Sequence, residues 1–186
     1  IGAVVHPASV RANLQHTADA LSAERSFRLL ALLGPQHGAR GEKQDNMIES
    51  DHYRDPETRV PVHSLYSETR RPTAEMLHNL DALVYDLQDV GTRVYTFAHT
   101  MAYCMEACAE HHKRMIVLDR PNPINGTHVE GNLLAPDLRS FVGLFPIPMR
   151  HGLTIGELAL LINSEFGIGC DLTVVPMQGW HRSQWF

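Results

Sequence analysis

Short apolar runs alternate along this chain with segments in which apolar residues recur every three or four positions. The runs have strand length, and the recurring pattern is typical of amphipathic helices. The pattern predicts strands at residues 1–6, 27–33, 60–65, 81–86, 114–119 and 171–176. It predicts helices at residues 10–23, 72–77, 96–112 and 154–166, the last opened by a capping box made of Thr154 and Glu157.

Strands separated by helices indicate βαβ units. Such units build a mainly parallel sheet with helices on both faces, so the expected fold is α/β with three αβα layers. Residues 1–186 are expected to form one domain, with a linker or second domain possible near 177–186. The chain starts inside a predicted strand and ends without a terminating signal, so we expect it to be the N-terminal part of a longer protein.

Composition and charge narrow the function classes. The chain is 44% hydrophobic and 20% charged, which is ordinary for a globular protein. With 16 basic and 21 acidic residues its formal net charge is -5, which argues against nucleic-acid binding. No apolar run approaches the roughly 20 residues that span a bilayer, so no membrane span is expected. The compartment and the oligomeric state stay open.

Signatures of metals and nucleotides are absent from the sequence. The three cysteines fit small buried side chains better than a zinc site, because no further ligands follow at suitable spacing. Gly167-Ile168-Gly169 lacks the third glycine of a dinucleotide fingerprint, and no phosphate-binding loop occurs. A serine-hydrolase elbow is missing too. The sequence therefore predicts no metal and no cofactor.

Polar clusters recur where the predicted strands end. In a parallel sheet the carboxyl ends of the strands lie along one edge, where ligands bind, so these clusters are expected to converge on one crevice. The first cluster, after the strand at 27–33, contains Gln36, His37, Arg40 and Glu42. The others contain Asp86, Gln88, Asp89, Arg93 and Tyr95, then Asp119, Arg120 and Asn122, then Arg150 and His151.

Each cluster also has a purely structural interpretation. Asp86 or Asp89 could cap the following helix, and Asp119 could form a structural ion pair with Arg120. Asn122-Pro123 is a turn signal, and a histidine in the last cluster could simply pack in the core. Four clusters at corresponding positions favour one shared polar site over four unrelated structural features.

The side chains of these clusters suggest the chemistry of a ligand. Carboxylates and amides hydrogen-bond hydroxyl groups, and arginine forks recognise carboxylates or phosphates. A polyhydroxylated ligand with an acidic group would bind both the carboxylates and amides and the arginines.

Long motifs in these clusters are similar to a known family. The sequence resembles the exo-β-N-acetylmuramidase family of peptidoglycan glycosidases, formerly a domain of unknown function. The resemblance covers nearly the whole chain, and its matching stretches are residues 34–38, 61–66, 71–73, 86–97, 118–123, 129–131, 141–143, 146–158 and 171–175.

The resemblance implies a Rossmann-like N-terminal domain, followed in the family by a smaller C-terminal domain that this chain lacks. It implies removal of terminal N-acetylmuramic acid from peptidoglycan fragments, as in bacterial cell-wall recycling, without metal or nucleotide. The expected partner is therefore a peptidoglycan-derived saccharide. Its lactyl carboxylate would be recognised by an arginine, for which Arg93 and Arg150 are the candidates.

One position departs from the family pattern. The family usually reads Pro-Glu-His-Gly, with the glutamate as the proposed catalytic residue, whereas this chain has Gln36 there. An amide cannot exchange a proton as a carboxyl group does, and glycoside hydrolysis usually needs two carboxyl groups. Either another carboxylate acts, or this chain belongs to a branch of the family with altered activity. A substrate-assisted route is a further alternative, in which the acetamido group of the sugar serves as nucleophile while Gln36 orients it and His37 or a nearby carboxylic acid serves the leaving group.

The site residues expected from the sequence form two groups. The catalytic candidates are Gln36, His37, Glu42, Asp86, Asp119 and Glu130. The substrate-binding candidates are Arg40, Gln88, Asp89, Arg93, Tyr95, Arg120, Asn122, Arg150 and His151. The leading function is a muramidase-like glycosidase, and the alternatives are a catalytically weak muramyl-saccharide-binding protein and a nucleotide-binding Rossmann module.

Overall fold

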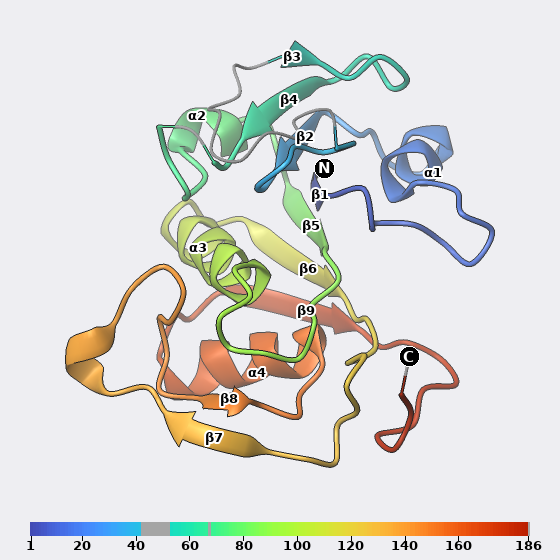
Figure 1. The fold of residues 1–186 in the computed structure, drawn as a ribbon. Helices are drawn as coiled ribbons and strands as arrows, with labels where there is room; N and C mark the ends of the chain where they lie inside the picture. Colours follow the sequence, from blue (N-terminus) through green and yellow to red (C-terminus); the bar gives the residue numbers. More distant parts are fainter. Residues whose placement is uncertain (42–52, 67, 186) are drawn as a thin grey trace.

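The computed structural model describes residues 1–41, 53–66 and 68–185, which form a main sheet, a small two-stranded sheet and several helices (Figure 1). The main sheet contains β1 (Gly2–Val5), β2 (Ala31–Gly34), β3 (Tyr53–Arg54), β4 (Pro61–Ser64), β5 (Ala82–Asp86), β6 (Arg114–Leu118) and β9 (Asp171–Val175). The small sheet contains β7 (Glu130–Leu133) and β8 (Pro148–Arg150). The helices are α1 (Thr17–Ala23), α2 (Ala74–Leu77), α3 (Phe97–Glu110), the 3-10 helix η1 (Pro136–Leu138) and α4 (Ile155–Glu165).

The main sheet is seven-stranded, with the order β3-β4-β2-β1-β5-β6-β9. Every neighbouring pair is parallel except β3 and β4. Taken in chain order, the six parallel strands have the arrangement 3-2-1-4-5-6, which is that of a Rossmann-like sheet. The expected α/β class with a mainly parallel sheet is confirmed.

Alternate side chains of the central strands enter two separate cores. Val4 packs in a core with side chains of α2, α3 and α4, whereas Ala3 and Val5 pack in a second core with Ala18 of α1. Side chains alternate across a strand, so each central strand is covered on both faces and reads as a continuous apolar run. Figure 1 shows α1 on one side of the sheet and α3 and α4 on the other.

The predicted helix at 10–23 is wrong in its first half. The helix begins only at Thr17, capped by the His16 side chain, which accepts a hydrogen bond from the Ala18 amide. The preceding segment folds back on itself through a bridge between Val10 and His16. Leu14 is one of the apolar residues at helical spacing on which the predicted helix rests. It has φ 63° and is 79% exposed, so it lies in a turn.

Two further differences concern strands. The strand predicted at 27–33 begins later, as β2 at Ala31–Gly34, although the main chain at Arg28 and Leu30 already hydrogen-bonds to Ile1. The ribbon of β7 and β8 was not predicted. All residues of β7 are exposed, so the period-two pattern that reveals a half-buried strand is lacking there.

The last described residues pack against the domain instead of leaving it. The Gly126 amide donates to the Arg182 carbonyl, and the Arg182 guanidinium donates to the carbonyls of Gly126 and Gly152. The boundary expected near 177–186 stays a prediction. The cysteines are free and buried, and none of the helices among the described residues is long and apolar enough to cross a membrane.

Candidate functional site

The strand order places a switch point between β1 and β5. The connections of the two halves of the sheet run in opposite directions from there, and in open α/β sheets ligands bind beyond the carboxyl ends of the strands at such a point, which is called the crevice below. His6 follows β1, the loop 35–41 follows β2, and the loop 87–96 follows β5, so all three border this position. The loop between β1 and α1 begins His6-Pro7-Ala8-Ser9 and has no glycine with which to wrap a pyrophosphate.

The loop after β2 is a tight turn with its polar residues at the apex. His37 and Gly38 both have left-handed backbones, with φ 73° and 79°. Gly34 has no room for a side chain, because a Cβ there would lie 2.8 Å from the Ala39 amide nitrogen. Gln36 is half-buried, and its side chain makes no hydrogen bond to the part of the chain that the structure describes. The hydrogen-bonding capacity of its amide is therefore unused within the described residues.

His6 directly follows β1 at the switch point and was missed as a site residue. Burial, followed by the nearby His37 and His16, lowers the pKa of His6 to about 4, so its imidazole is neutral at pH 7. Its ring meets Phe97 edge-on at 5.0 Å, and Phe97 meets Tyr95 at 4.7 Å. The signal was present in the sequence, because His6 directly follows the first strand as the other candidates follow theirs.

Asp89 and His151 form a buried pair. His151 Nε2 lies 3.3 Å from Asp89 Oδ2, which also accepts a 2.7 Å hydrogen bond from the Gly91 amide. Oδ1 of Asp89 is buried and has no hydrogen-bond donor. The pKa of Tyr95 is raised by burial and by the Asp89 charge. The loop after β5 is thus joined to the segment at 148–153, as the sequence predicts.

Asp86 is fully engaged within the protein. Arg120 binds it through two hydrogen bonds, Nε to Oδ1 at 2.6 Å and Nη2 to Oδ2 at 2.9 Å. The Thr17 hydroxyl adds a third at 2.5 Å. Asp86 is 2% exposed, so this arrangement fixes the loops after β5 and β6 to α1 and gives both carboxylate oxygens a donor from the protein.

Asp119 holds the beginning of α4. Its oxygens accept hydrogen bonds from the Gly156 amide at 2.8 Å, the Thr154 hydroxyl at 3.1 Å and the Arg120 amide at 3.0 Å. Burial raises the pKa of Asp119, although these hydrogen bonds oppose the rise. The capping box of Thr154 and Glu157 predicted for this helix is present. A carboxylate at a helix N-terminus is stabilised by the helix dipole, which favours a structural role.

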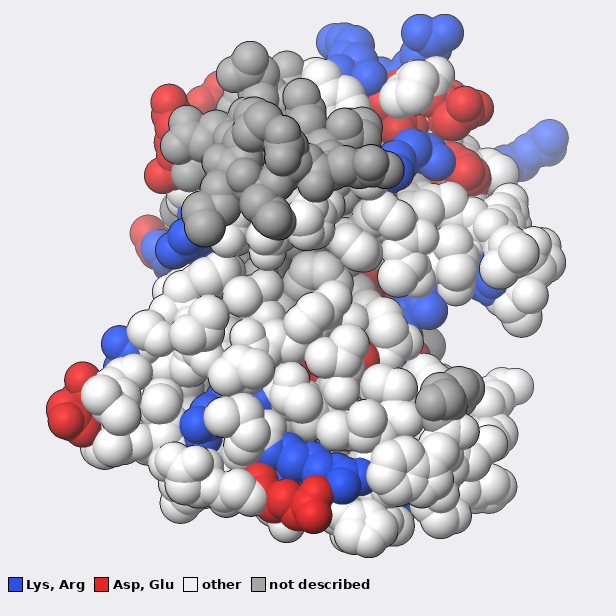
Figure 2. Space-filling model, viewed as in Figure 1, with Lys and Arg blue, Asp and Glu red and all other residues white. Residues whose placement is uncertain are grey.

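The two arginines proposed for the lactyl carboxylate bind groups of the protein. Arg93 is buried, and its Nη1 donates to the Asn132 and Ile147 carbonyls at 2.8 and 2.6 Å. Arg150 binds Glu130 at 2.5 Å and donates a second hydrogen bond to the Ile124 carbonyl. Figure 2 shows a blue and a red patch adjoining over β7 and β8, where the Arg150–Glu130 ion pair lies. Recognition of substrate by either arginine stays a prediction.

Arg40 ties the loop after β2 to two acidic residues. It binds Asp55 through two hydrogen bonds of 2.5 and 2.9 Å and Asp19 of α1 at 2.5 Å. Burial would raise the pKa of Asp55, but hydrogen bonds from Arg40 and Thr58 outweigh it and lower the pKa to about 2. Arg40 therefore positions the turn that carries Gln36. The catalytic candidate Glu42 lies outside the described residues.

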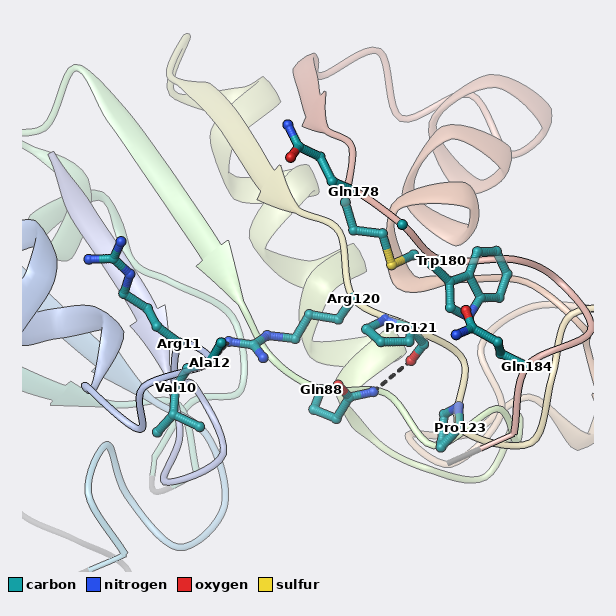
Figure 3. A pocket seen from close by; sticks show the side chains of 12 residues that line it. Val10, Arg11, Ala12, Gln88, Arg120, Pro121, Pro123, Gln178, Trp180 and Gln184 are labelled. Carbon is teal, nitrogen blue, oxygen red and sulfur yellow. Dashed lines mark hydrogen bonds between the residues drawn. The ribbon is translucent and has the colours of Figure 1, made fainter.

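The remaining candidates, Gln88 and Asn122, link the loops after β5 and β6 to each other and to the segment before α4. Asn122 is buried and donates to the Leu153 carbonyl at 2.9 Å, and Gln88 donates to the Pro121 carbonyl at 2.8 Å. Gln88 and Arg120 also line a cavity of about 1100 Å³ at this sheet edge, shown in Figure 3. The cavity is lined by loops other than the one carrying Gln36, so the cavity and the crevice at the switch point are distinct parts of one edge.

The fold and the crevice define a class: a Rossmann-like α/β domain whose polar edge lacks the glycine turn of dinucleotide-binding proteins. The family model described as "Exo-beta-N-acetylmuramidase NamZ, N-terminal" matches residues 1–186, and the chain belongs to this family. Peptidoglycan beta-N-acetylmuramidase NamZ of Bacillus subtilis (strain 168) is 52% identical over 186 residues, which are 100% of this chain and 45% of that protein.

Two solved structures of DUF1343 family proteins from Bacteroides fragilis share the fold. One has a TM-score of 0.91 and 46% identity, covering 99% of this chain and 46% of its own. The other has a TM-score of 0.81 and 36% identity, covering 100% of this chain and 48% of its own. The chain thus spans about half the length of the relatives it matches.

Proposed function

We propose that this domain is the N-terminal half of a glycosidase that removes terminal N-acetylmuramic acid from peptidoglycan fragments. Support comes from family membership and from the Bacillus subtilis relative, a peptidoglycan beta-N-acetylmuramidase. The observation that carries the proposal is the turn after β2, which contains Gln36 and brings His37 near His6 at the switch point. The terminal sugar binds in this crevice.

The arrangement of carboxylates favours a substrate-assisted route. Of the acidic candidates among the described residues, Asp86 and Asp119 are engaged by protein donors and Glu130 pairs with Arg150. In the proposed route the acetamido oxygen of the sugar attacks the anomeric carbon, and the glycosidic oxygen leaves with a proton from His37 or Glu42. Water then opens the cyclic intermediate. Gln36 orients the acetamide by hydrogen bonds.

Gln36 is the position at which this proposal is tested, in the full-length protein that contains this domain. Replacing Gln36 with alanine removes the orienting amide, and we expect turnover of a muramyl disaccharide to fall by about 10²-fold or more. Gln36→Glu restores the residue of the family pattern, and we expect turnover to rise. Arg114→Ala, on the opposite edge of the sheet in an exposed ion pair, is the control. Unchanged turnover in both Gln36 variants would contradict the proposal.

A second candidate function follows from the same residue. With an amide in place of the family's glutamate, the domain would bind muramyl saccharides without cleaving them. Calorimetry with a muramyl disaccharide, run beside a product assay, separates the two functions. Binding without release of N-acetylmuramic acid favours the second candidate, and release by the unmodified protein excludes it.

A further inference from the structure

A cavity of about 1100 Å³ lies at the carboxyl edge of the sheet, beside the crevice (Figure 3). It is lined by the loop after β1 at 10–12, by Gln88 after β5, by the loop after β6 at 120–123 and by residues 177–184 after β9. Its volume is slightly above the roughly 300–1,000 Å³ typical of ligand pockets. The roles proposed above for the crevice leave this cavity unused.

The walls combine flat apolar surfaces with amides. Trp180, Met177, Pro121 and Pro123 supply the apolar surfaces, and Gln88, Gln178 and Gln184 supply the amides. The pyranose ring has an apolar C–H face and a rim of hydroxyl groups, so it needs both kinds of wall. Figure 3 shows Trp180 and Gln184 on the C-terminal segment and Gln88 and Pro121 on the neighbouring loops.

The cavity carries little free charge. Its lining includes no acidic residue and two arginines. Arg120 is neutralised by Asp86. Arg11 donates to Gln15 at 3.2 Å, and Figure 3 shows its side chain pointing away from Trp180. An uncharged ligand therefore fits this cavity better than a muramic acid carboxylate or an acidic peptide.

Hydrogen-bonding groups in the wall are left unused. Trp180 Nε1 is buried and has no acceptor. Gln88 donates from its amide nitrogen to the carbonyls of Asp89 and Pro121, while its oxygen accepts no hydrogen bond from the described part of the chain. The Trp180 donor is enclosed by protein atoms, whereas the Gln88 amide oxygen is free to accept a hydrogen bond from a ligand hydroxyl or amide.

We propose that this cavity binds the uncharged N-acetylhexosamine that follows the terminal muramic acid. The inference rests on the proposed function, and it assigns the leaving-group side of the same site. Gln88 lines the cavity, and its neighbour Asp89 belongs to the crevice, so a disaccharide held with one ring in each place crosses the loop after β5. Trp180 packs against the ring, and the amides bind its acetamido and hydroxyl groups.

The first test compares two substrates in the full-length protein: a disaccharide of N-acetylmuramic acid and N-acetylglucosamine, and the methyl β-glycoside of N-acetylmuramic acid. Trp180→Ala is expected to lower kcat/KM for the disaccharide about tenfold and to leave the methyl glycoside within about twofold. Trp180→Phe retains an aromatic face and is expected to recover most of the loss. The matched control is Trp185→Phe, because Trp185 is exposed and does not line the cavity. Equal losses on both substrates would overturn the assignment.

The second test needs no hydrolysis. The indole N–H resonance of Trp180, identified by its loss in Trp180→Phe, is followed by NMR as the methyl β-glycoside of N-acetylglucosamine is added. A saturating shift at Trp180 without one at Trp185 supports the proposal, and an unmoved Trp180 resonance contradicts it. If neither substrate of the first test is cleaved, the proposed function fails, while this titration still decides whether the cavity binds the sugar.

Discussion

Asp86 and Asp89 are acidic residues at the end of β5 and in the loop after it, and each is 2% exposed, yet their surroundings differ. Every oxygen of the Asp86 side chain has a donor, from Arg120 and Thr17. Asp89 has one oxygen bound by Gly91 near His151 and one buried oxygen with no donor. A saturated buried carboxylate holds the fold together, whereas an unsatisfied one is tolerated where the protein needs its charge.

The largest expected effect is on stability at Asp86. Asp86→Asn leaves the Arg120 guanidinium without its counterion, and breaking such a pair costs about 3–5 kcal/mol. Urea unfolding of the domain measures this loss. Arg114→Ala, which breaks the exposed pair with Asp171, is expected to change the free energy of unfolding by less than about 1 kcal/mol. Similar losses in the two variants would show that the Asp86 pair is no more important than a surface pair.

The same substitution at Asp89 should affect the crevice more than the fold. An asparagine retains an acceptor for the Gly91 amide, so we expect a loss of only about 1 kcal/mol in the free energy of unfolding. The Asp89 charge contributes to the raised pKa of Tyr95, so Asp89→Asn is expected to lower that pKa. Ultraviolet titration of tyrosinate, with Tyr95→Phe to identify the signal, measures the shift. An unchanged pKa of Tyr95 would contradict the assignment of Asp89 as a source of charge in the crevice.

The smallest effect concerns acid stability at a third carboxylate, which resembles Asp86. Arg40 and Thr58 lower the pKa of Asp55 from 3.8 to about 2, although burial opposes this shift. A lowered folded pKa stabilises the protein above pH 3.8, and this stabilisation is lost as the pH falls toward 2. Asp55→Asn should therefore flatten the decline in melting temperature between pH 4 and pH 2. An unchanged slope would assign the acid sensitivity to other groups.

The central sheet could be predicted from the sequence because its strands are buried on both faces. Continuous apolar runs such as Leu83-Val84-Tyr85 carry that signal, and the polar residues after them mark the sheet edge. The convergence of the loop after β5 with the loops that carry Asn122 and His151 follows from the same reasoning, and the structure shows those contacts.

The partners of individual polar side chains could not be predicted in the same way. Arg93 donates to the carbonyls of Asn132 and Ile147, and nothing in its local sequence indicates contacts with residues so far along the chain. The turn before α1 was missed because Leu14 continues an apolar period while its backbone is left-handed. The spacing of apolar residues along the sequence reports only the type of each side chain, whereas these features depend on tertiary contacts.

The strand order also has a consequence for the kinetics of folding. β1 is made first but lies at the centre of the sheet, where Gly2 is opposite Ala31 on one side and Leu83 on the other. The segment between β1 and β5 is longer than the one between β1 and β2. It must close before the pairing of β1 with β5 contributes any stability, and this slows folding. During synthesis β1, β2 and β4 can associate early, but the crevice has no second wall until β5 docks. The crevice therefore cannot form before β5 joins the sheet.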